Sequence, residues 1–201
     1  KGGGTPRKEN LHFWNGDIPW VSPKDMKSQS ISSTIDSVTK LAVRQSSTNL
    51  LAEGALLLVV RSGILQHTIP VAINSVPVTL NQDMKALLFS YRMTSKFAMF
   101  FILGSQKSLL FEWCKQGATV ESIEHEYLAN SELPIPTLDE QKAIVDFLDH
   151  ETARIDALIE EKMSLAHDLI TGDGGAEKLL TDMSAEELLS LAALDVNSAV
   201  V

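Results

Sequence analysis

The last third of the chain most restricts its fold, because apolar residues recur there at alternating intervals of four and three positions. This spacing is typical of one face of a long α-helix, and it predicts a continuous helix over residues 137–171. Such a helix pairs with a second helix, as in a coiled coil, or lies along its own domain, and the pattern leaves both arrangements open. The stripe consists of Ile144, Leu148, Ile155, Leu158, Leu165 and Leu169, interrupted by Glu151 and Lys162.

Two prolines, Pro134 and Pro136, separate this helical region from the rest of the chain. Before them, over residues 1–136, short strand-like apolar segments alternate with helical ones, so we expect an α+β (mixed α/β) globular domain. After the long helix, three glycines within residues 172–175 end the helical pattern. A second helical segment is expected beyond them, over residues 176–195.

Within the first region the clearest strand is expected at 55–61, because five consecutive apolar residues occur there. A single helix, weakened in its middle by Gly104, is expected at 95–115. Shorter strands are expected at 18–22, 68–73, 77–80 and 86–91. The remaining expectations are a loop with a short helix at 28–39, a tight turn at Asn15-Gly16-Asp17 and a flexible opening at Gly2-Gly3-Gly4.

Charge divides the 201-residue chain at nearly the same place. The whole chain has a net charge of −9, but residues 1–134 carry 13 Lys and Arg against 11 Asp and Glu, whereas residues 135–201 carry 4 against 15. The mildly basic first region leaves nucleic-acid binding open for that region, and the acidic second region indicates a different partner.

Composition excludes several classes of protein. The single cysteine, Cys114, cannot form an internal disulfide, which excludes a disulfide-stapled secreted scaffold and makes the cytoplasm the expected location. The longest apolar run, residues 97–103, is far shorter than the roughly 20 residues of a membrane-spanning helix. No export leader is evident, and because Lys1 is not a methionine the sequence is expected to begin inside a longer gene product.

Candidate catalytic groups are few. Two triplets, Asp25-Met26-Lys27 and Asp83-Met84-Lys85, resemble the second half of a metal-dependent nuclease site, where carboxylates hold Mg²⁺ and a lysine assists the attacking water. The five histidines have no Cys or His neighbour at the spacing of metal ligands, so no metal site is expected. The proline-containing loop and the Gly-rich turn of adenine methyltransferases do not occur in the sequence.

Four blocks of sequence resemble the target recognition domain of type I restriction–modification specificity subunits. They occur in the family's order and cover the chain from residue 2 to about residue 162. The chain departs from the family in having one recognition domain where two are usual, and beyond residue 162 it is not typical of a spacer helix. The blocks are Gly3–Pro6 with Trp14–Met26, Leu57–Ile64 with Pro70–Ala72, Thr79–Leu87, and Leu133–Asp149 continuing as ETARIDALIEEK.

The resemblance implies a non-catalytic subunit that recognises double-stranded DNA and directs an adenine methyltransferase subunit and a restriction subunit to a target site. It implies that S-adenosylmethionine, ATP and Mg²⁺ are bound by those partners, so no cofactor is expected on this chain. It also implies that the long helix is a spacer that packs against a second helix and against methyltransferase subunits. A homodimer would supply that second helix, and a hairpin with residues 176–195 is the alternative.

Members of the family read different DNA sequences, so the base-reading residues are expected between the shared blocks. The candidates for contact with phosphates and base edges are basic and polar side chains in those gaps and around the second block. Two interpretations remain beside DNA recognition: a standalone Mg²⁺-dependent nuclease that uses the Asp-x-Lys triplets, and a helical interaction protein that binds no DNA. The candidate DNA-binding residues are Lys27, Lys40, Arg44, Gln45, Arg61, His67, Lys107, Lys115 and Gln116, with Ser30 and Gln106 as further members.

Overall fold

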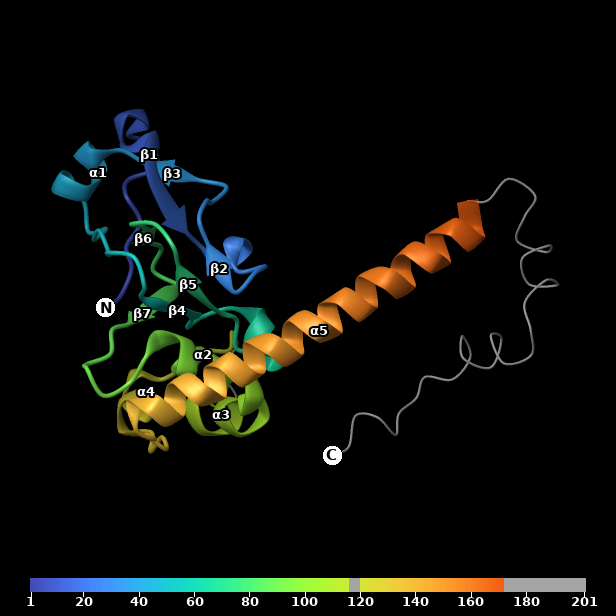
Figure 1. Ribbon diagram of the computed structural model, residues 1–201. Helices are drawn as coiled ribbons and strands as arrows, with labels where there is room; N and C mark the ends of the chain where they lie inside the picture. The colour runs from blue at the N-terminus through green and yellow to red at the C-terminus, as the bar shows by residue number, and fades with distance from the viewer. Residues whose placement is uncertain (116–119, 172–201) are drawn as a thin grey trace, which may run out of the picture. The chain divides into compact units, whose positions relative to one another are not determined.

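The computed structural model describes residues 1–115 and 120–171, with side chains placed up to residue 167. Figure 1 shows two β-sheets and a group of helices in the first part of the chain, followed by the long helix α5 (Leu138–Thr171). The expected combination of an α+β domain and a long helix is therefore confirmed. The segment expected to be helical at 176–195 lies outside the described residues.

The larger sheet has β4 at its centre, and both faces of that strand are covered. β4 pairs antiparallel with β5 and with β7, and β2 pairs parallel with β5. Leu56 and Leu58 face a cluster built with helices, whereas Leu57 and Val59 face a second cluster built with other strands. A strand that is buried on both faces does not need to alternate apolar and polar residues, which explains the continuous apolar sequence of β4. The strands in sheet order are β2 (Ser30–Ile31), β5 (Val71–Asn74), β4 (Leu56–Val59) and β7 (Met84–Leu87).

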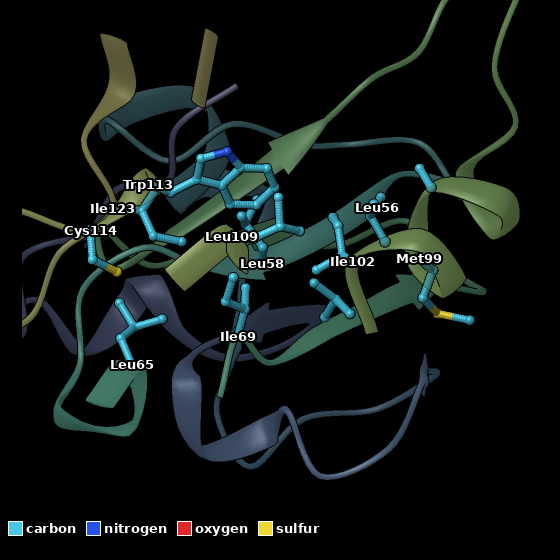
Figure 2. Packing of buried hydrophobic residues seen from close by; sticks show 12 residues of the cluster. Leu56, Leu58, Leu65, Ile69, Met99, Ile102, Leu109, Trp113, Cys114 and Ile123 are labelled. Atoms are coloured by element: carbon cyan, nitrogen blue, oxygen red, sulfur yellow. The ribbon is translucent and has the colours of Figure 1, made fainter. Parts of the chain in front are cut away.

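Three helices accompany this sheet, and the first two contribute residues to the cluster on its helical side. Figure 2 shows Leu56 and Leu58 of β4 in one cluster with residues of α2 and α3. The contributing helical side chains include Met99, Ile102, Leu109 and Trp113. The helices are α2 (Ser95–Gly104), α3 (Gln106–Trp113) and α4 (His125–Asn130).

The single helix expected at 95–115 is wrong, because the chain turns between α2 and α3. The N–H of Ser105 donates to the carbonyl oxygens of Phe101 (3.0 Å) and Ile102 (3.3 Å), which closes α2. The change of direction places Leu109 and Trp113 in the same cluster as α2, and one straight helix would carry them away from it.

The smaller sheet is built around β1 (Trp14–Val21), which pairs antiparallel with β3 (Ser37–Val38) and parallel with β6 (Thr79–Leu80). Val38 lies opposite both Trp14 and Ile18, so β1 bulges between them. Asn15 at the bulge has φ +58°, a left-handed conformation that asparagine tolerates better than most residues. The tight turn expected at Asn15-Gly16-Asp17 is therefore wrong: the Asn-Gly pair bends a strand.

The segment at 28–39 contains the short strands β2 and β3 instead of the expected helix. Helix formation begins only afterwards, at α1 (Lys40–Gln45), because the hydroxyl of Thr39 caps that helix by accepting the N–H of Ala42 at 3.2 Å. Three short 3₁₀ turns complete the domain: η1 (Leu11–Phe13), η2 (Pro23–Asp25) and η3 (Gly63–Gln66).

The N-terminal glycines are held in place, so the flexible opening expected there is also wrong. The N–H of Gly3 donates to the carbonyl oxygen of Met84 at 3.3 Å, and the N–H of Gly4 donates to the carbonyl oxygen of Leu80 at 2.8 Å. A Cβ atom on Gly3 would lie 1.9 Å from the carbonyl oxygen of Asn81. Glycine is required there because two backbones approach each other closely.

Helix α5 begins with a capping box. The N–H and the hydroxyl of Thr137 each donate to the Glu140 carboxylate at 2.8 Å, and the N–H of Glu140 donates back to the Thr137 hydroxyl at 3.4 Å. The hydrogen bonds from Thr137 lower the pKa of Glu140, because they stabilise its ionised form.

The next residue, Gln141, is fully buried and joins three segments. Its amide nitrogen donates to the carbonyl oxygens of Arg92 (2.8 Å) and Pro136 (2.9 Å), and its amide oxygen accepts the N–H of Thr94 (2.9 Å). Val145, one turn later, is also buried. The first compact unit accordingly spans Lys1–Leu148, and the second unit begins at Asp149.

Beyond these turns the predicted stripe of α5 is largely exposed within the described residues. Ile155 is 51% exposed, Leu158 49% and Leu165 45%. Ile144, at the start of the stripe, is 39% exposed, whereas Leu148 is partly buried. The side chain of Leu169 lies outside the described part of the chain. None of the helices described has both the length and the apolar composition required to cross a membrane.

Candidate nucleic-acid interface

The candidate DNA-binding residues that the structure describes fall into separate groups. Lys40, Arg44 and Gln45 are exposed on the six-residue helix α1. Lys27 is exposed just after η2, where its backbone N–H donates to the carbonyl oxygen of Asp25 at 2.8 Å, and Ser30 is exposed in β2. Gln116 lies outside the described residues.

Arg61, His67, Lys107 and Lys115 form a second group, which we call the η3–α3 surface. All four side chains are exposed. Arg61 and Lys115 both contact the segment around Ser122: Arg61 forms a β-bridge with it, and the N–H of Lys115 donates to its carbonyl oxygen at 3.2 Å. Two candidates that are 54 positions apart in the sequence therefore flank one short segment.

The other half of this surface is tied together by Gln106, which the sequence places among the DNA-binding candidates. Its side-chain oxygen accepts the backbone N–H of Ile69 (2.9 Å) and the hydroxyl of Thr68. Gln106 is thus occupied in joining the start of α3 to the segment after η3. This contact brings His67, which precedes Thr68, beside the first turn of α3, where Lys107 lies.

The two Asp-x-Lys triplets have structural contacts that argue against a nuclease site. The Asp25 carboxylate accepts the N–H and the hydroxyl of Ser22, both at 2.8 Å, and the N–H of Ile35 at 2.9 Å. Asp83 forms an ion pair with Arg61 at 2.7 Å. Lys85 approaches Nδ1 of His125 at 3.1 Å instead of Asp83. Within residues 1–115 and 120–167, no three His, Cys, Asp or Glu side chains gather in an arrangement that could hold a metal ion.

A groove of about 600 Å³ lies between the N-terminal residues, β1, η2 and the turn after β6, and we call it the N-terminal groove. The rings of Trp14 and Trp20 meet edge to face at 5.2 Å along its wall. Asn81 closes the turn, because its side-chain oxygen accepts the N–H of Asp83 at 2.9 Å. The hydroxyl of Thr5 donates to the side-chain oxygen of Gln82. The basic lining residues are Lys8 and Lys24.

Sequence reasoning misses the cations of this groove. Lys24 lies inside a block shared with the family, where residues are expected to build the fold, and Arg7 and Lys8 directly follow the opening that is expected to be flexible. Arg7 instead lines a neighbouring hollow of about 660 Å³ together with Gln45. The signal that could find them is the Arg-Lys pair directly after Thr5-Pro6, ahead of an aromatic segment.

The only cysteine of the sequence, Cys114, is buried beside the η3–α3 surface. Burial raises the pKa of the Cys114 thiol, and the negative charge of Glu121 raises it further. A thiol with a raised pKa stays protonated near neutral pH, so it is a weak nucleophile.

The sequence of the chain is similar to a known protein family and to two characterised members of it. The type I restriction modification DNA specificity domain, as a sequence family, matches residues 1–164. The Escherichia coli type I restriction enzyme EcoR124I/EcoR124II specificity subunit is 42% identical over 150 residues, which are 74% of this chain and 37% of that protein. The MjaIX specificity subunit of Methanocaldococcus jannaschii is 29% identical over 164 residues, 80% of this chain and 36% of that protein. The chain spans little more than a third of the length of these relatives.

Solved structures show the same fold at low sequence identity. A chain from a structure that concerns complex assembly and conformational transition of the type I R-M system has a TM-score of 0.67 and 16% identity, over 84% of this chain and 39% of that chain. The HsdS subunit from Thermoanaerobacter tengcongensis has a TM-score of 0.61 and 16% identity, over 80% of this chain and 36% of that one. The family match includes both the compact unit and most of α5, and the chain belongs to the type I restriction modification DNA specificity domain family.

Proposed function

We propose that this chain is a DNA-recognition module of a type I restriction–modification specificity subunit and that it acts without catalysing a reaction itself. The family match over residues 1–164 carries the proposal, since it extends through the domain and into the helix that follows. The contacts of Asp25 and Asp83 support it as well, because both carboxylates are already bound by groups of the protein. The module works in the cytoplasm, together with the DNA and the partner subunits.

DNA binding is assigned first to the η3–α3 surface. Three of its four residues, Arg61, Lys107 and Lys115, carry a positive charge at neutral pH, and Lys107 and Lys115 have no ion-pair partner among the residues described. Exposed cations of this kind bind phosphates and release counterions, so the affinity for DNA falls as salt rises. Arg61 is held by Asp83 at 2.7 Å but is 58% exposed, so its guanidinium remains accessible to a phosphate or a base edge.

The exposed stripe of α5 is assigned to partner subunits. An apolar stripe half exposed at Ile155 and Leu158 is a contact surface for another helix. We assign it to a second copy of this chain, which would provide two recognition domains from two identical subunits, and to the methyltransferase subunit. S-adenosylmethionine, ATP and Mg²⁺ then belong to the methyltransferase and restriction subunits, and this chain needs no cofactor of its own.

The test compares two triple alanine variants of the full chain in a binding assay with short duplex DNA of random sequence. Replacing Arg61, Lys107 and Lys115 should lower affinity and reduce the slope of log affinity against log salt by about one for each phosphate that is no longer bound. The matched variant replaces Lys27, Lys40 and Arg44, which removes the same formal charge from the other group of candidates. A greater reduction of affinity in the matched variant would move the interface to that group, and no DNA binding by the wild-type chain would contradict the proposed function.

A further inference from the structure

Phe111 is exposed to an unusual degree for an aromatic side chain. It lies on the eight-residue helix α3, and 79% of its surface is accessible. The opposite face of the same helix buries Leu109 and Trp113 in the domain core (Figure 2). The ring of Phe111 therefore contributes nothing to the packing that holds α3 in place.

The neighbours of Phe111 on this outer face are basic. Lys107 lies four residues earlier and thus one turn away on the same side of the helix, and Lys115 follows the end of the helix. Glu112, the adjacent carboxylate, accepts a hydrogen bond from the hydroxyl of Ser131 at 2.7 Å and is directed to that side. Along the chain the exposed ring thus lies between Lys107 and Lys115, and the segment that carries Glu121 and Glu124 pairs with the residues at the end of α3.

Tyr127 on α4 shows that exposure alone does not distinguish Phe111. Tyr127 is 49% exposed, but its neighbours along the chain include Glu124 and Glu126, which repel a polyanion. Phe111 thus has the cation Lys107 one turn away on its own helix, whereas Tyr127 directly follows the carboxylate of Glu126; Glu124 lies near both helices, since its N–H donates to the carbonyl oxygen of Trp113 at 2.9 Å. The two helices contact each other in one domain, so they form a matched pair.

We infer that α3 enters the major groove of the DNA and that Phe111 packs against thymine methyl groups there, while Lys107 and Lys115 bind phosphates. This inference rests on the proposed function. An α-helix with its side chains is about 10–12 Å across, which fits the roughly 12 Å width of the major groove, and the eight residues of α3 can lie along it. The C5-methyl group of thymine is the apolar feature that this groove displays, and a phenyl ring is suited to contact it. Phe111 is then a specificity-determining residue, since no other base offers that methyl group.

The experiment measures binding of the full chain to two pools of short random duplexes, one with thymine and one with deoxyuridine, which lacks only the methyl group. The wild type should bind the thymine pool several-fold more tightly. Phe111→Ala should reduce affinity for the thymine pool about fivefold and should no longer distinguish the pools. Its salt slope should stay unchanged, because every ionic interaction is kept, whereas Lys107→Ala should reduce the slope by about one.

Tyr127→Ala is the control and should bind both pools as the wild type does. Phe111→Leu keeps an apolar side chain and should retain part of the preference for thymine, which guards against an effect of misfolding. Equal binding of wild type and Phe111→Ala would overturn the inference while leaving DNA recognition intact. A Phe111→Ala variant that binds DNA normally but no longer assembles with the methyltransferase subunit would also overturn it, in favour of a protein contact.

Discussion

Leu57 and Leu158 are the same residue type in two different surroundings. Leu57 lies in β4, where strands on both sides and a cluster of apolar side chains exclude water completely. Leu158 lies on α5 with half of its surface exposed. The compact unit buries many of its apolar side chains in its own core, whereas the part of α5 beyond Leu148 leaves apolar side chains exposed. The first region is therefore stabilised from within, whereas the apolar residues of the second would be covered by the partner proposed above.

Gln141 joins the start of α5 to the compact unit. It lies on the first turn of α5, yet its side chain forms hydrogen bonds with backbone groups of Arg92, Thr94 and Pro136. A buried amide with matched partners fixes a helix direction more narrowly than an apolar side chain would, because hydrogen bonds are directional. The start of α5 is thus part of the domain, although its sequence pattern is that of the exposed helix.

Replacing this amide should produce the largest decrease in stability. Gln141→Ala leaves the Thr94 N–H and two carbonyl oxygens without partners in a buried site, which should lower the free energy of unfolding of the compact unit by about 2–4 kcal/mol. Denaturant unfolding followed by tryptophan fluorescence measures this change. Lys142→Ala is the control, since Lys142 makes an exposed pair with Asp146 at 3.1 Å and its replacement should cost about 0.5 kcal/mol or less. Equal effects of the two variants would show that the hydrogen bonds of Gln141 do not stabilise the compact unit.

The parts of the fold that could be predicted are those that depend on local pattern. The apolar run at 56–60 indicates a buried strand, and the four-three spacing locates α5 to within a residue of its start. The errors arise where distant contacts decide the conformation. Gly3 is fixed by the backbone of Asn81, and the turn between α2 and α3 is fixed by a core that lies elsewhere in the chain. Such contacts leave no periodic signal.

The sequence predicts which types of residue form the candidate site, but not which of them lie together in space. The cations expected to bind DNA are exposed where the structure describes them, but nothing in their spacing indicates that Arg61 and Lys115 flank the same segment. Gln106 is a candidate base reader by residue type, because amides suit adenine, although its oxygen is bound within the protein. Phe111 has no role in the sequence-based interpretation, since an isolated phenylalanine in a helix is usually part of a core.

The capping box should make the start of α5 sensitive to acid, with a smaller effect than the replacement of Gln141. The folded state holds Glu140 ionised with a lowered pKa, so its contribution to stability is present above the ordinary pKa of a glutamate side chain and disappears as pH falls through the lower pKa of the folded state. We expect wild type to be more stable than Glu140→Gln at neutral pH and the difference to vanish in acid. Thermal melts across this range measure it, and a constant difference would contradict the role of the charge.

The smallest expected effect on stability comes from Leu158→Glu. This variant tests most directly the contrast between the buried core of the compact unit and the exposed stripe of α5. Because Leu158 makes no part of the domain core, the compact unit should unfold at the same denaturant concentration as the wild type. If the stripe is the interface of a homodimer, the same change places a charge in an apolar interface and should shift the chain from dimer to monomer in light scattering at micromolar concentration. Ala153→Glu adds the same charge about 140° around the helix and should leave the dimer intact. A wild-type chain that is already a soluble monomer, and is indifferent to Leu158→Glu, would refute the dimer and leave the stripe to the methyltransferase subunit or to a contact within the chain.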